Sequence, residues 1–165
     1  MNKLDLSDYK NRLLPKMLTL QAQQAGNTEF LITDERRLTF AEAEQVANSI
    51  AAGLQEIGVS KGDRVAFYLD NGWEPVLIAL AVNKLGAVWV PINTDYKGAW
   101  LQDTIVRSSC NVLITEVALQ DRLAEIADQL PAMKWIIKGN SSEFKMKDAI
   151  SFDALCDHAP LTPNY

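Results

Sequence analysis

Residues 83–93, Asn-Lys-Leu-Gly-Ala-Val-Trp-Val-Pro-Ile-Asn, decide the fold that this sequence predicts. The apolar run 75–82, which has the length of a helix and almost no polar face, leads into them. Gly86 supplies the left-handed conformation that ends a helix at low cost. Residues 87–90 form a short, continuously apolar run, which is typical of a strand covered on both faces, and Pro91, which has no N–H, ends it. A buried helix followed by a buried strand is half of a parallel βαβ unit.

Helices and strands alternate on both sides of this unit. Thr39 and Glu42 stand three apart before an amphipathic run, a pattern that predicts a capping box. Asp70 or Asn71 is expected to cap the apolar helix, whose surface requires cover from more than one sheet face. The remaining pattern predicts strands at 29–33, 38–40, 64–69, 111–114 and 134–138, helices at 9–25, 40–57, 97–109 and 119–130 (the last capped by Thr115), a short helix or irregular wrap at 150–155 and a linker at 159–165.

This alternation of strands and helices is typical of an α/β domain. The predicted fold class is a doubly wound, mainly parallel sheet (Rossmann- or flavodoxin-like) with a small N-terminal β-hairpin. We expect residues 1–37 to form an N-terminal helix and the hairpin, 38–140 the βα core, and 141–165 an irregular tail and linker.

The bulk composition is that of an ordinary soluble globular domain. The 165 residues suffice for one domain or large subdomain with a core of its own. A net charge of −5 argues against a nucleic-acid or anionic-membrane partner, because such a partner requires a basic stripe. No apolar run approaches the roughly 20 residues of a membrane-spanning helix, so no transmembrane segment is expected.

The cysteines and the N-terminus predict a reducing compartment. Cys110 and Cys156 are far apart and belong to no CxxC or Cys/His cluster. Two buried thiols are favoured, although a disulfide stays open. Residues 1–8 place acids where a signal peptide needs an apolar core. The expected location is therefore cytoplasmic.

A search for catalytic motifs assigns no catalytic, cofactor-binding or metal-ligating residue. The sequence has no G-x-x-x-x-G-K-[ST] loop, no G-x-G-x-x-G after a strand and no G-x-S-x-G elbow. His158 is the only histidine, and it lies beside a proline in the least regular stretch, which does not favour a catalytic triad. Acid pairs such as Asp34/Glu35 are expected to be surface charges, and no metal-ligand spacing is present.

Ligands of open α/β sheets bind at the carboxyl ends of the strands. The loops 70–73 and 93–96 follow strands and are therefore the places where a ligand would be expected. Trp73, Trp89 and Trp100 are expected to pack in the core rather than to stack on a ligand. From the residues alone, the prediction is an α/β domain with no site of its own.

Three stretches together resemble the N-terminal part of the adenylate-forming superfamily, which includes acyl-CoA synthetases, luciferases and the adenylation domains of peptide synthetases. Residues 38–43, Leu-Thr-Phe-Ala-Glu-Ala, are similar to the first core motif, Leu-Thr-Tyr-x-Glu-Leu. Residues 58–66 match Gly-Val-x-x-Gly-Asp-Arg-Val-Ala. Residues 84–93 resemble the second core motif, Lys-x-Gly-Ala-x-x-Val-Pro-[IL]-[ND]. The run that begins at Pro91 is more similar to fatty-acyl or carnitine-CoA ligases than to peptide synthetases.

The resemblance implies a two-step reaction for the parent enzyme. A carboxylate attacks the α-phosphate of ATP with the help of Mg²⁺ and yields an acyl-adenylate and pyrophosphate. Coenzyme A then displaces AMP and forms a thioester. Backbone N–H groups, cations and lysines are needed where negative charge develops in these steps.

The sequence departs from the full family pattern. It lacks the phosphate loop Ser-Gly-Thr-Thr-Gly-x-Pro-Lys, the adenine- and ribose-binding motifs and the lysine-bearing C-terminal domain. In family members the phosphate loop begins shortly after the position at which this sequence reaches Tyr165. The expectation is therefore an N-terminal portion that is structural and inactive alone, and whose partner is the remainder of a longer chain.

Two other hypotheses remain open. A stand-alone α/β module could use the apolar surface of residues 76–82 to bind a partner protein or a second copy. A flavodoxin-like cofactor binder is also conceivable, but the loops lack the Ser, Thr and Gly content of a phosphate cradle. The acyl substrate and the oligomeric state are not predicted.

Overall fold

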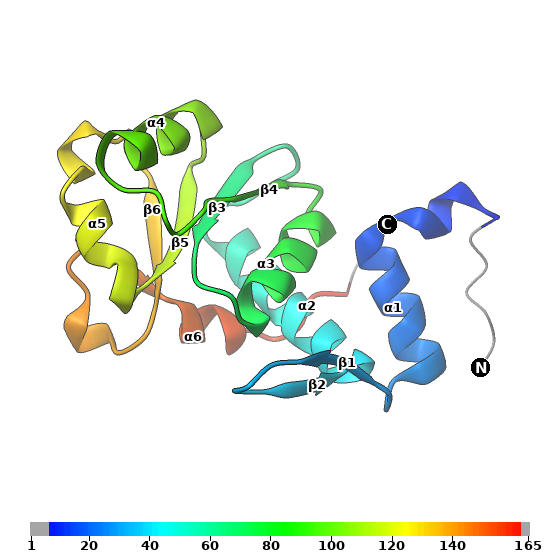
Figure 1. Ribbon diagram of the computed structural model, residues 1–165. Helices are drawn as coiled ribbons and strands as arrows, with labels where there is room; N and C mark the ends of the chain where they lie inside the picture. The colour runs from blue at the N-terminus through cyan, green and yellow to red at the C-terminus, as the bar shows by residue number, and fades with distance from the viewer. Residues whose placement is uncertain (1–6, 163–165) are drawn as a thin grey trace.

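The computed structural model describes residues 7–162 (Figure 1). The acidic N-terminus, from which we inferred that no signal peptide is present, lies mostly outside the described residues, as do the last three residues of the expected linker. The chain begins with a 3-10 helix η1 (Tyr9–Arg12) and the helix α1 (Leu14–Ala25). A hairpin follows, formed by the antiparallel strands β1 (Glu29–Ile32) and β2 (Arg37–Thr39). The predicted N-terminal helix and hairpin are confirmed.

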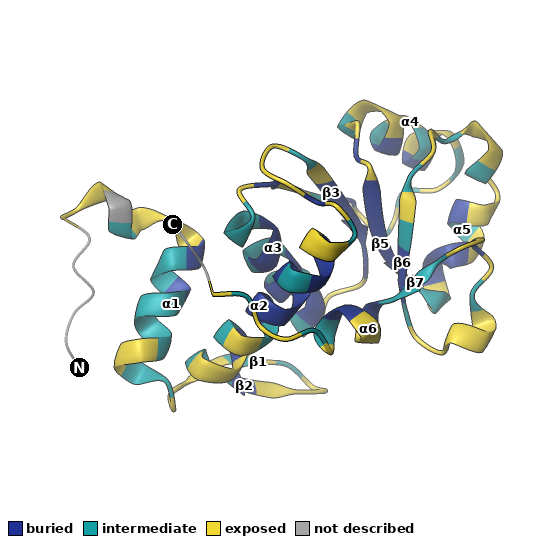
Figure 2. Ribbon diagram, turned by 180° about the vertical axis from the view of Figure 1, so that it is seen from behind, coloured by how far each residue is buried: buried dark blue, intermediate teal, exposed yellow. Residues whose placement is uncertain are grey.

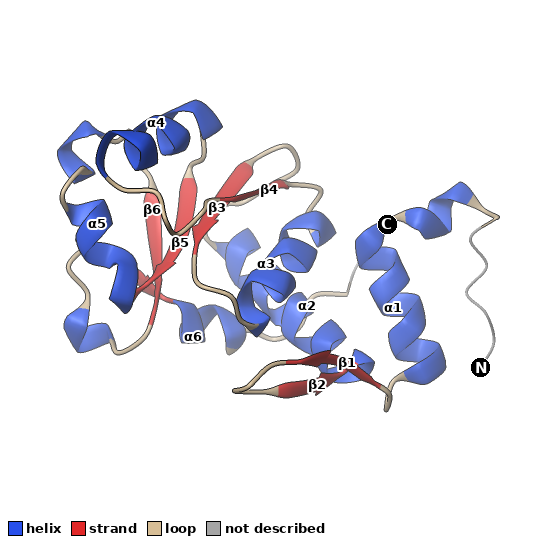
Figure 3. Cartoon of the chain, viewed as in Figure 1, coloured by secondary structure: helices blue, strands red, loops and turns tan. Residues whose placement is uncertain are grey.

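A five-stranded sheet forms the centre of the molecule (Figure 3). Its strand order is β4-β3-β5-β6-β7, and every neighbouring pair is parallel. The strands are β3 (Arg64–Tyr68), β4 (Val88–Pro91), β5 (Val112–Glu116), β6 (Lys134–Lys138) and β7 (Ile150–Ser151). This is the flavodoxin-like order, in which the second strand of the sheet lies outside the first. The predicted parallel α/β fold is confirmed.

Helices cover both faces of the sheet. One face packs against α2 (Phe40–Glu56), α3 (Trp73–Lys84) and α6 (Phe152–Cys156), with α1 outside α2 and α3. The other face packs against α4 (Gly98–Ser108) and α5 (Gln120–Ala124). Alternate residues of each strand enter the two cores: Val65 and Phe67 of β3 face α2 and α3, whereas Ala66 and Tyr68 face α4 and α5. β3 and β5 are buried along nearly their whole length, and α2 is buried on the side that faces the sheet (Figure 2).

The capping box at the start of α2 is confirmed. The backbone N–H of Glu42 donates to Thr39 Oγ1 at 3.3 Å, and the backbone N–H of Thr39 donates to Glu42 Oε2 at 2.8 Å. Two of the N–H groups that a helix start leaves without intrahelical partners are thereby satisfied. The second family-like stretch is also structural, because Asp63 Oδ2 accepts the N–H and the hydroxyl of Ser60 in the turn before β3.

The prediction of a cap at Asp70 or Asn71 is wrong. The residue that precedes α3 is Gly72, and no side chain caps this helix. The expected cover of α3 comes from within the chain, because every residue of α3 is buried or half-buried and both α1 and α2 pack against it. The apolar surface of residues 76–82 is therefore mostly covered, and the module hypothesis is left with the half-buried Val76, Ala79 and Leu80 of this helix.

The prediction of a covered strand at residues 87–90 is also wrong. β4 is the edge of the sheet and pairs only with β3. Val88 and Trp89 are 49% and 38% exposed. A short apolar run in the sequence does not distinguish a central strand from an edge strand, because both can consist of apolar residues.

Three smaller differences concern the second half of the chain. The single helix predicted for 119–130 is broken into η2 (Val117–Leu119), α5 and η3 (Ala127–Gln129), although its apolar stripe still faces the core. Thr115 does not cap it, because this residue lies in β5 and its hydroxyl donates to the Tyr68 carbonyl oxygen at 2.9 Å. Residues 150–155 form the fifth strand, β7, and most of α6, after the 3-10 helix η4 (Ser141–Glu143).

Candidate functional site

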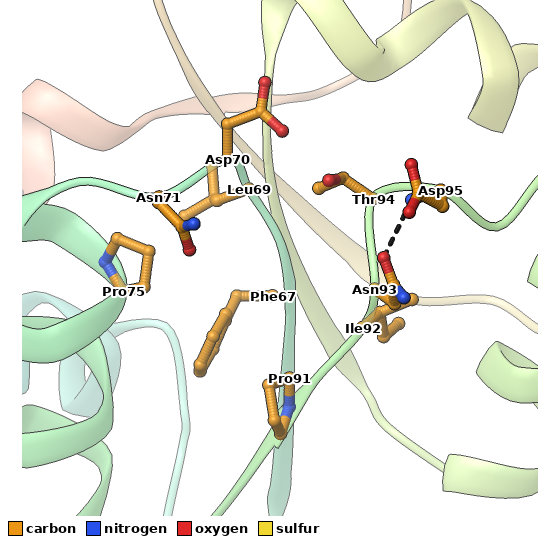
Figure 4. A pocket seen from close by; sticks show the side chains of 10 residues that line it. All are labelled: Phe67, Leu69, Asp70, Asn71, Pro75, Pro91, Ile92, Asn93, Thr94 and Asp95. Atoms are coloured by element: carbon orange, nitrogen blue, oxygen red, sulfur yellow. Dashed lines mark hydrogen bonds between the residues drawn. The ribbon is translucent and has the colours of Figure 1, made fainter.

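The two loops singled out by the sequence meet at the carboxyl edge of the sheet. They line an open hollow of about 720 Å³ between the ends of β3 and β4 and the start of α3 (Figure 4). Its floor is apolar and its rim is polar. The floor consists of Phe67, Leu69, Pro75, Pro91 and Ile92, and the rim of Asp70, Asn71, Asn93, Thr94 and Asp95. The hollow therefore lies at the carboxyl edge of the sheet, the edge at which open α/β sheets bind ligands.

The remaining residues of these loops do not line the hollow. Trp73 packs against Phe152, with ring centroids 6.1 Å apart, and the Arg36 guanidinium lies over its ring. Trp73 thus packs in the core as predicted. Trp100 does not, because it is 73% exposed on α4 with only the edge of Tyr96 beside it.

A buried tyrosine and an arginine hold the loop after β4. The hydroxyl of Tyr68 donates toward the carbonyl oxygens of Thr94 and Tyr96, at 3.0 and 2.8 Å. Arg122 of α5 donates from Nη1 to the Tyr68 hydroxyl at 3.1 Å and also to the Thr94 carbonyl oxygen. The hydrogen bond with Tyr68, helped by the charges of Asp70 and Asp95, raises the pKa of Arg122. The Arg122 guanidinium is therefore positively charged and hydrogen-bonded to the backbone of this loop.

A carboxylate occupies the switch point of the sheet. The chain leaves β3 toward α3 on one face and leaves β5 toward α5 on the other, and ligands of open sheets bind where the connections diverge. Here Glu116 Oε1 accepts the backbone N–H of Asp70 at 2.9 Å. The Asp70 N–H is therefore already engaged, and the carboxylate that accepts it would repel an anion.

The first turn of α3 carries a buried acid whose carboxylate pairs with a lysine of β6. Glu74 is 2% exposed, and its carboxylate lies 2.5 Å from Lys138 Nζ. Burial alone lowers the pKa of Lys138, but its hydrogen bond and charge pairing with Glu74 outweigh burial and raise it. A Cβ on Gly72 would lie 2.5 Å from Glu74 Oε2, so glycine leaves the space that this carboxylate needs.

The residues at this edge do not fit the phosphates of ATP, which the family resemblance implies. Its charged rim is acidic, its arginine is engaged, and the first turn of the nearby helix α3 carries the buried carboxylate of Glu74, which would repel a phosphate. Among residues 7–162, no group of three or more His, Cys, Asp or Glu side chains is placed to hold a metal ion. We therefore derive no catalytic step through a nucleotide or Mg²⁺ at this hollow.

The other chemically reactive side chains lie elsewhere. The Nδ1 atom of His158 is 3.1 Å from Glu56 Oε2, at the end of α2, and His158 does not line the hollow. Neither cysteine forms a disulfide. Burial raises the pKa of the Cys110 thiol, and burial with neighbouring carboxylates raises that of Cys156 to about 12. Neither thiol is therefore a ready nucleophile near neutral pH.

Sequence reasoning missed one buried polar cluster in the third family-like stretch. Lys84 Nζ lies 2.8 Å from Glu44 Oε2, with side chains only 2% and 13% exposed. Thr19 and Asn48 donate to the other oxygen of the same carboxylate. The only signal available was the spacing of Glu44 and Asn48, one helical turn apart, which does not reveal their partners. The three stretches thus serve helix starts, turns and helix packing.

No helix within residues 7–162 is long and apolar enough to span a membrane.

The match to known proteins covers nearly the whole chain: the family model described as "AMP-binding enzyme" matches residues 18–164.

Two curated relatives illustrate the sequence similarity. A medium/long-chain-fatty-acid–CoA/3-oxocholest-4-en-26-oate–CoA ligase of Mycobacterium marinum is 31% identical over 134 residues, which are 79% of this chain and 24% of the relative. A 3-[(3aS,4S,7aS)-7a-methyl-1,5-dioxo-octahydro-1H-inden-4-yl]propanoyl:CoA ligase of Mycobacterium tuberculosis is 30% identical over 158 residues, 90% of this chain and 31% of the relative. The chain thus spans less than a third of the length of these relatives.

Solved structures share the fold. The N-terminal domain of FACL13 from Mycobacterium tuberculosis matches 92% of this chain and 37% of its own, at a TM-score of 0.74 and 25% identity. A benzoate CoA ligase from Burkholderia xenovorans LB400 matches 90% of this chain and 29% of its own, at a TM-score of 0.78 and 20% identity. This chain therefore belongs to the AMP-binding family of acyl-CoA ligases and corresponds to the N-terminal portion of its longer members.

Proposed function

We propose that this chain is the N-terminal portion of an ATP-dependent, AMP-forming acyl-CoA synthetase and that it is structural and inactive alone. The parent enzyme would convert a carboxylate and ATP into an acyl-adenylate and then, with coenzyme A, into a thioester. The observation that carries the proposal is the family match over residues 18–164 in a chain spanning 24% to 31% of its relatives. The whole chain, 1–165, would act as one subdomain of that enzyme.

The geometry of the sheet edge supports the inactivity of the portion alone. Adenylation needs donors and cations where charge develops on phosphate and carbonyl oxygens. In the described chain the candidate donors are engaged: the Asp70 N–H by Glu116, Arg122 by the loop after β4, and Lys138 by Glu74. We therefore assign no catalytic, cofactor-binding or metal-ligating residue to this portion, and ATP, Mg²⁺ and coenzyme A to the parent enzyme.

The substrate is proposed to be a small carboxylic acid with a hydrophobic body, such as a fatty acid. This proposal rests on the names of the relatives, which describe ligases of medium- and long-chain fatty acids and of steroid-derived acids. The acidic net charge supports the absence of a nucleic-acid partner, and the two free thiols support a cytoplasmic location.

The experiment is pyrophosphate exchange into ATP in the presence of a fatty acid. The purified chain alone should give no exchange above background. The same chain mixed with the remaining portion of the Mycobacterium marinum ligase should restore exchange and acyl-CoA formation. Exchange by the chain alone would contradict the inactivity, and a mixture that binds but never forms thioester would contradict the assignment to a ligase.

The alternative is a stand-alone interaction module. The exposed apolar residues Val88 and Trp89 favour it, because exposed apolar patches mark interaction sites. A reading frame that stops after Tyr165 would favour the module, whereas one that continues into a glycine- and threonine-rich loop would favour the synthetase.

A further inference from the structure

The loop after β3 carries the only Asn-Gly pair of the sequence, Asn71 and Gly72. In such a pair the backbone nitrogen of the glycine can attack the side-chain amide carbon of the asparagine, because glycine has no Cβ beside the attacking atom. Whether a folded protein permits this attack depends on the exposure of the pair, on its hydrogen bonds and on its backbone surroundings.

The structure leaves both reacting groups of this pair accessible. Asn71 is exposed on the rim of the open hollow at the sheet edge (Figure 4). Within residues 7–162, neither the Asn71 side chain nor the Gly72 N–H has a hydrogen-bond partner. Gly72 precedes α3, so its N–H lies outside the hydrogen-bonded ladder that would hold it inside a helix. The attack therefore displaces no hydrogen bond of the described chain.

Two other asparagines in exposed loops are held by hydrogen bonds. The Oδ1 atom of Asn93 accepts the backbone N–H of Asp95 at 2.9 Å. The Oδ1 atom of Asn140 accepts the backbone N–H and the hydroxyl of Ser142 at 3.1 and 3.0 Å. The residue after each of these asparagines is a threonine or a serine, whose Cβ hinders attack by its own backbone nitrogen. The two asparagines therefore serve as references within the same protein.

A neighbouring carboxylate, rather than the backbone angles, favours glycine at position 72. Gly72 has φ of −170° and ψ of −166°, an extended conformation that any residue adopts. A Cβ there would lie 2.5 Å from Glu74 Oε2, and this buried carboxylate is paired with Lys138. A larger residue would slow the attack, but it would also disturb the pair of Glu74 and Lys138. The packing at the start of α3 thus keeps a reactive pair on the rim of the hollow.

We propose that Asn71 is a site of spontaneous deamidation. The Gly72 nitrogen gives up its proton to hydroxide and forms a bond to Cγ of Asn71, and the side-chain nitrogen takes a proton from water and leaves as ammonia. A water molecule then opens the resulting succinimide ring at either carbonyl carbon, which gives aspartate or isoaspartate. The net reaction consumes water, releases ammonia and oxidises nothing.

The product changes both the charge and the backbone of the rim. Each conversion adds a carboxylate to a rim that already carries Asp70 and Asp95, so the hollow becomes more acidic. The isoaspartate form also inserts a methylene group into the main chain between β3 and α3, directly before the glycine that leaves room for Glu74. This chemistry proceeds in the isolated chain, whatever reaction the parent enzyme performs.

The test incubates the purified chain at 37 °C and pH 8 and follows it by tryptic peptide mapping with mass spectrometry. The tryptic peptide 65–84 contains Asn71 and also Asn83, which lies inside α3, so fragment ions compare the two asparagines within one peptide. Deamidation at Asn71 should be at least about tenfold faster than at Asn83, Asn93 or Asn140, which corresponds to about 1.4 kcal/mol in the barrier. It should also be faster at pH 8 than at pH 6, because the attacking nitrogen must lose its proton.

Two variants separate the chemistry from the fold. Gly72→Ala places a Cβ beside the attacking nitrogen and should slow the reaction by about tenfold. Asn71→Gln keeps an amide but requires a larger ring, so it should abolish the modification at this position and leave the far-UV circular dichroism unchanged. It keeps the test decisive in the case that Gly72→Ala fails to fold.

Two results would overturn the proposal. The first is equal deamidation at Asn71 and Asn140 in the native chain. The second is a native rate at Asn71 more than about a hundredfold below the rate in the chain unfolded in urea, which would show that only opened molecules react and that the fold blocks the attack.

Discussion

Replacing Lys84 by methionine is predicted to destabilise the fold severely. Lys84 Nζ contacts Glu44 Oε2 at 2.8 Å, and both side chains are largely withdrawn from water. The other oxygen of Glu44 accepts from Thr19 Oγ1 at 2.7 Å and from Asn48 Nδ2 at 3.2 Å. Helices α1, α2 and α3 therefore meet at one carboxylate. Methionine keeps an unbranched apolar stem but leaves this carboxylate without the lysine cation.

The expected loss in the free energy of unfolding is about 3–5 kcal/mol, because a buried charge that loses its partner is poorly hydrated. Domains of this kind have about 5–15 kcal/mol in total, so the variant should be close to unfolding. Adding Glu44→Gln removes the charge and keeps an acceptor for Thr19 and Asn48. The double variant should therefore recover stability to within about 1–2 kcal/mol of wild type.

Urea unfolding followed by far-UV circular dichroism measures these changes. Arg107→Met is the matched control, because the Arg107–Asp103 pair on α4 is 79% and 59% exposed. This control should change stability by no more than about 0.5 kcal/mol. A Lys84→Met loss below about 1 kcal/mol, the range of exposed pairs, would refute the reasoning. A double variant no more stable than Lys84→Met would refute it as well.

Two further substitutions and one labelling experiment test other contacts. Thr39→Ala should cost about 1 kcal/mol at pH 7. Hydrogen bonds from the backbone N–H and from the hydroxyl of Thr39 lower the pKa of Glu42, and only the hydroxyl bond is lost in the variant. The stabilisation from that bond is present above pH 4.5 and fades as the pH falls through the lowered pKa of Glu42, so urea titrations should show a smaller difference in stability from wild type at pH 3 than at pH 7, and a constant or larger difference would contradict this. Gly72→Ala should cost about 1–3 kcal/mol in thermal unfolding, because its Cβ would lie 2.5 Å from Glu74 Oε2, and an unchanged transition would show that this carboxylate has room to move. Since burial and neighbouring carboxylates raise the pKa of the half-buried Cys156 to about 12, iodoacetamide at pH 8 should label this thiol much faster after unfolding than in the native protein, and equally fast labelling of the native protein would contradict the raised pKa.

Local sequence patterns predicted those features whose interacting residues all lie within one helix or its ends. The capping box of Thr39 and Glu42 is complete in sequence, because both partners lie within one turn of the helix. The left-handed Gly86, with φ of 68°, follows from the same kind of local signal. Alternation of such elements was enough to predict the doubly wound sheet.

The position of a strand within the sheet was not predictable in this way. β4 was expected to be covered, yet it lies at the edge. One signal was present: Pro91 faces outward, where its missing N–H costs no bond with β3, and prolines within sheets are confined to such places. β7 was missed because two residues are too few for any periodic pattern.

The location of the candidate site was predicted from the sequence, but the charges and hydrogen bonds of its residues were not. Loops 70–73 and 93–96 follow parallel strands, so their meeting at one edge follows from the fold. What occupies that edge depends on pairs distant in sequence: the Asp70 N–H with Glu116, 46 residues apart, and Tyr68 with Arg122, 54 residues apart. Sequence spacing does not predict such contacts. They place a carboxylate at this edge of the sheet, and they occupy the Asp70 N–H and the Arg122 guanidinium with partners from the protein itself.

Titration of MgATP into the purified chain, followed by isothermal calorimetry, tests most directly the claim that this portion is scaffold without a nucleotide site. The account predicts no saturable heat up to millimolar MgATP, because Glu116 accepts the Asp70 N–H and Glu74 pairs with Lys138, so that this N–H and this cation are both engaged by carboxylates. One-to-one binding at micromolar concentration would contradict it, and would show that the described edge rearranges to accept a nucleotide.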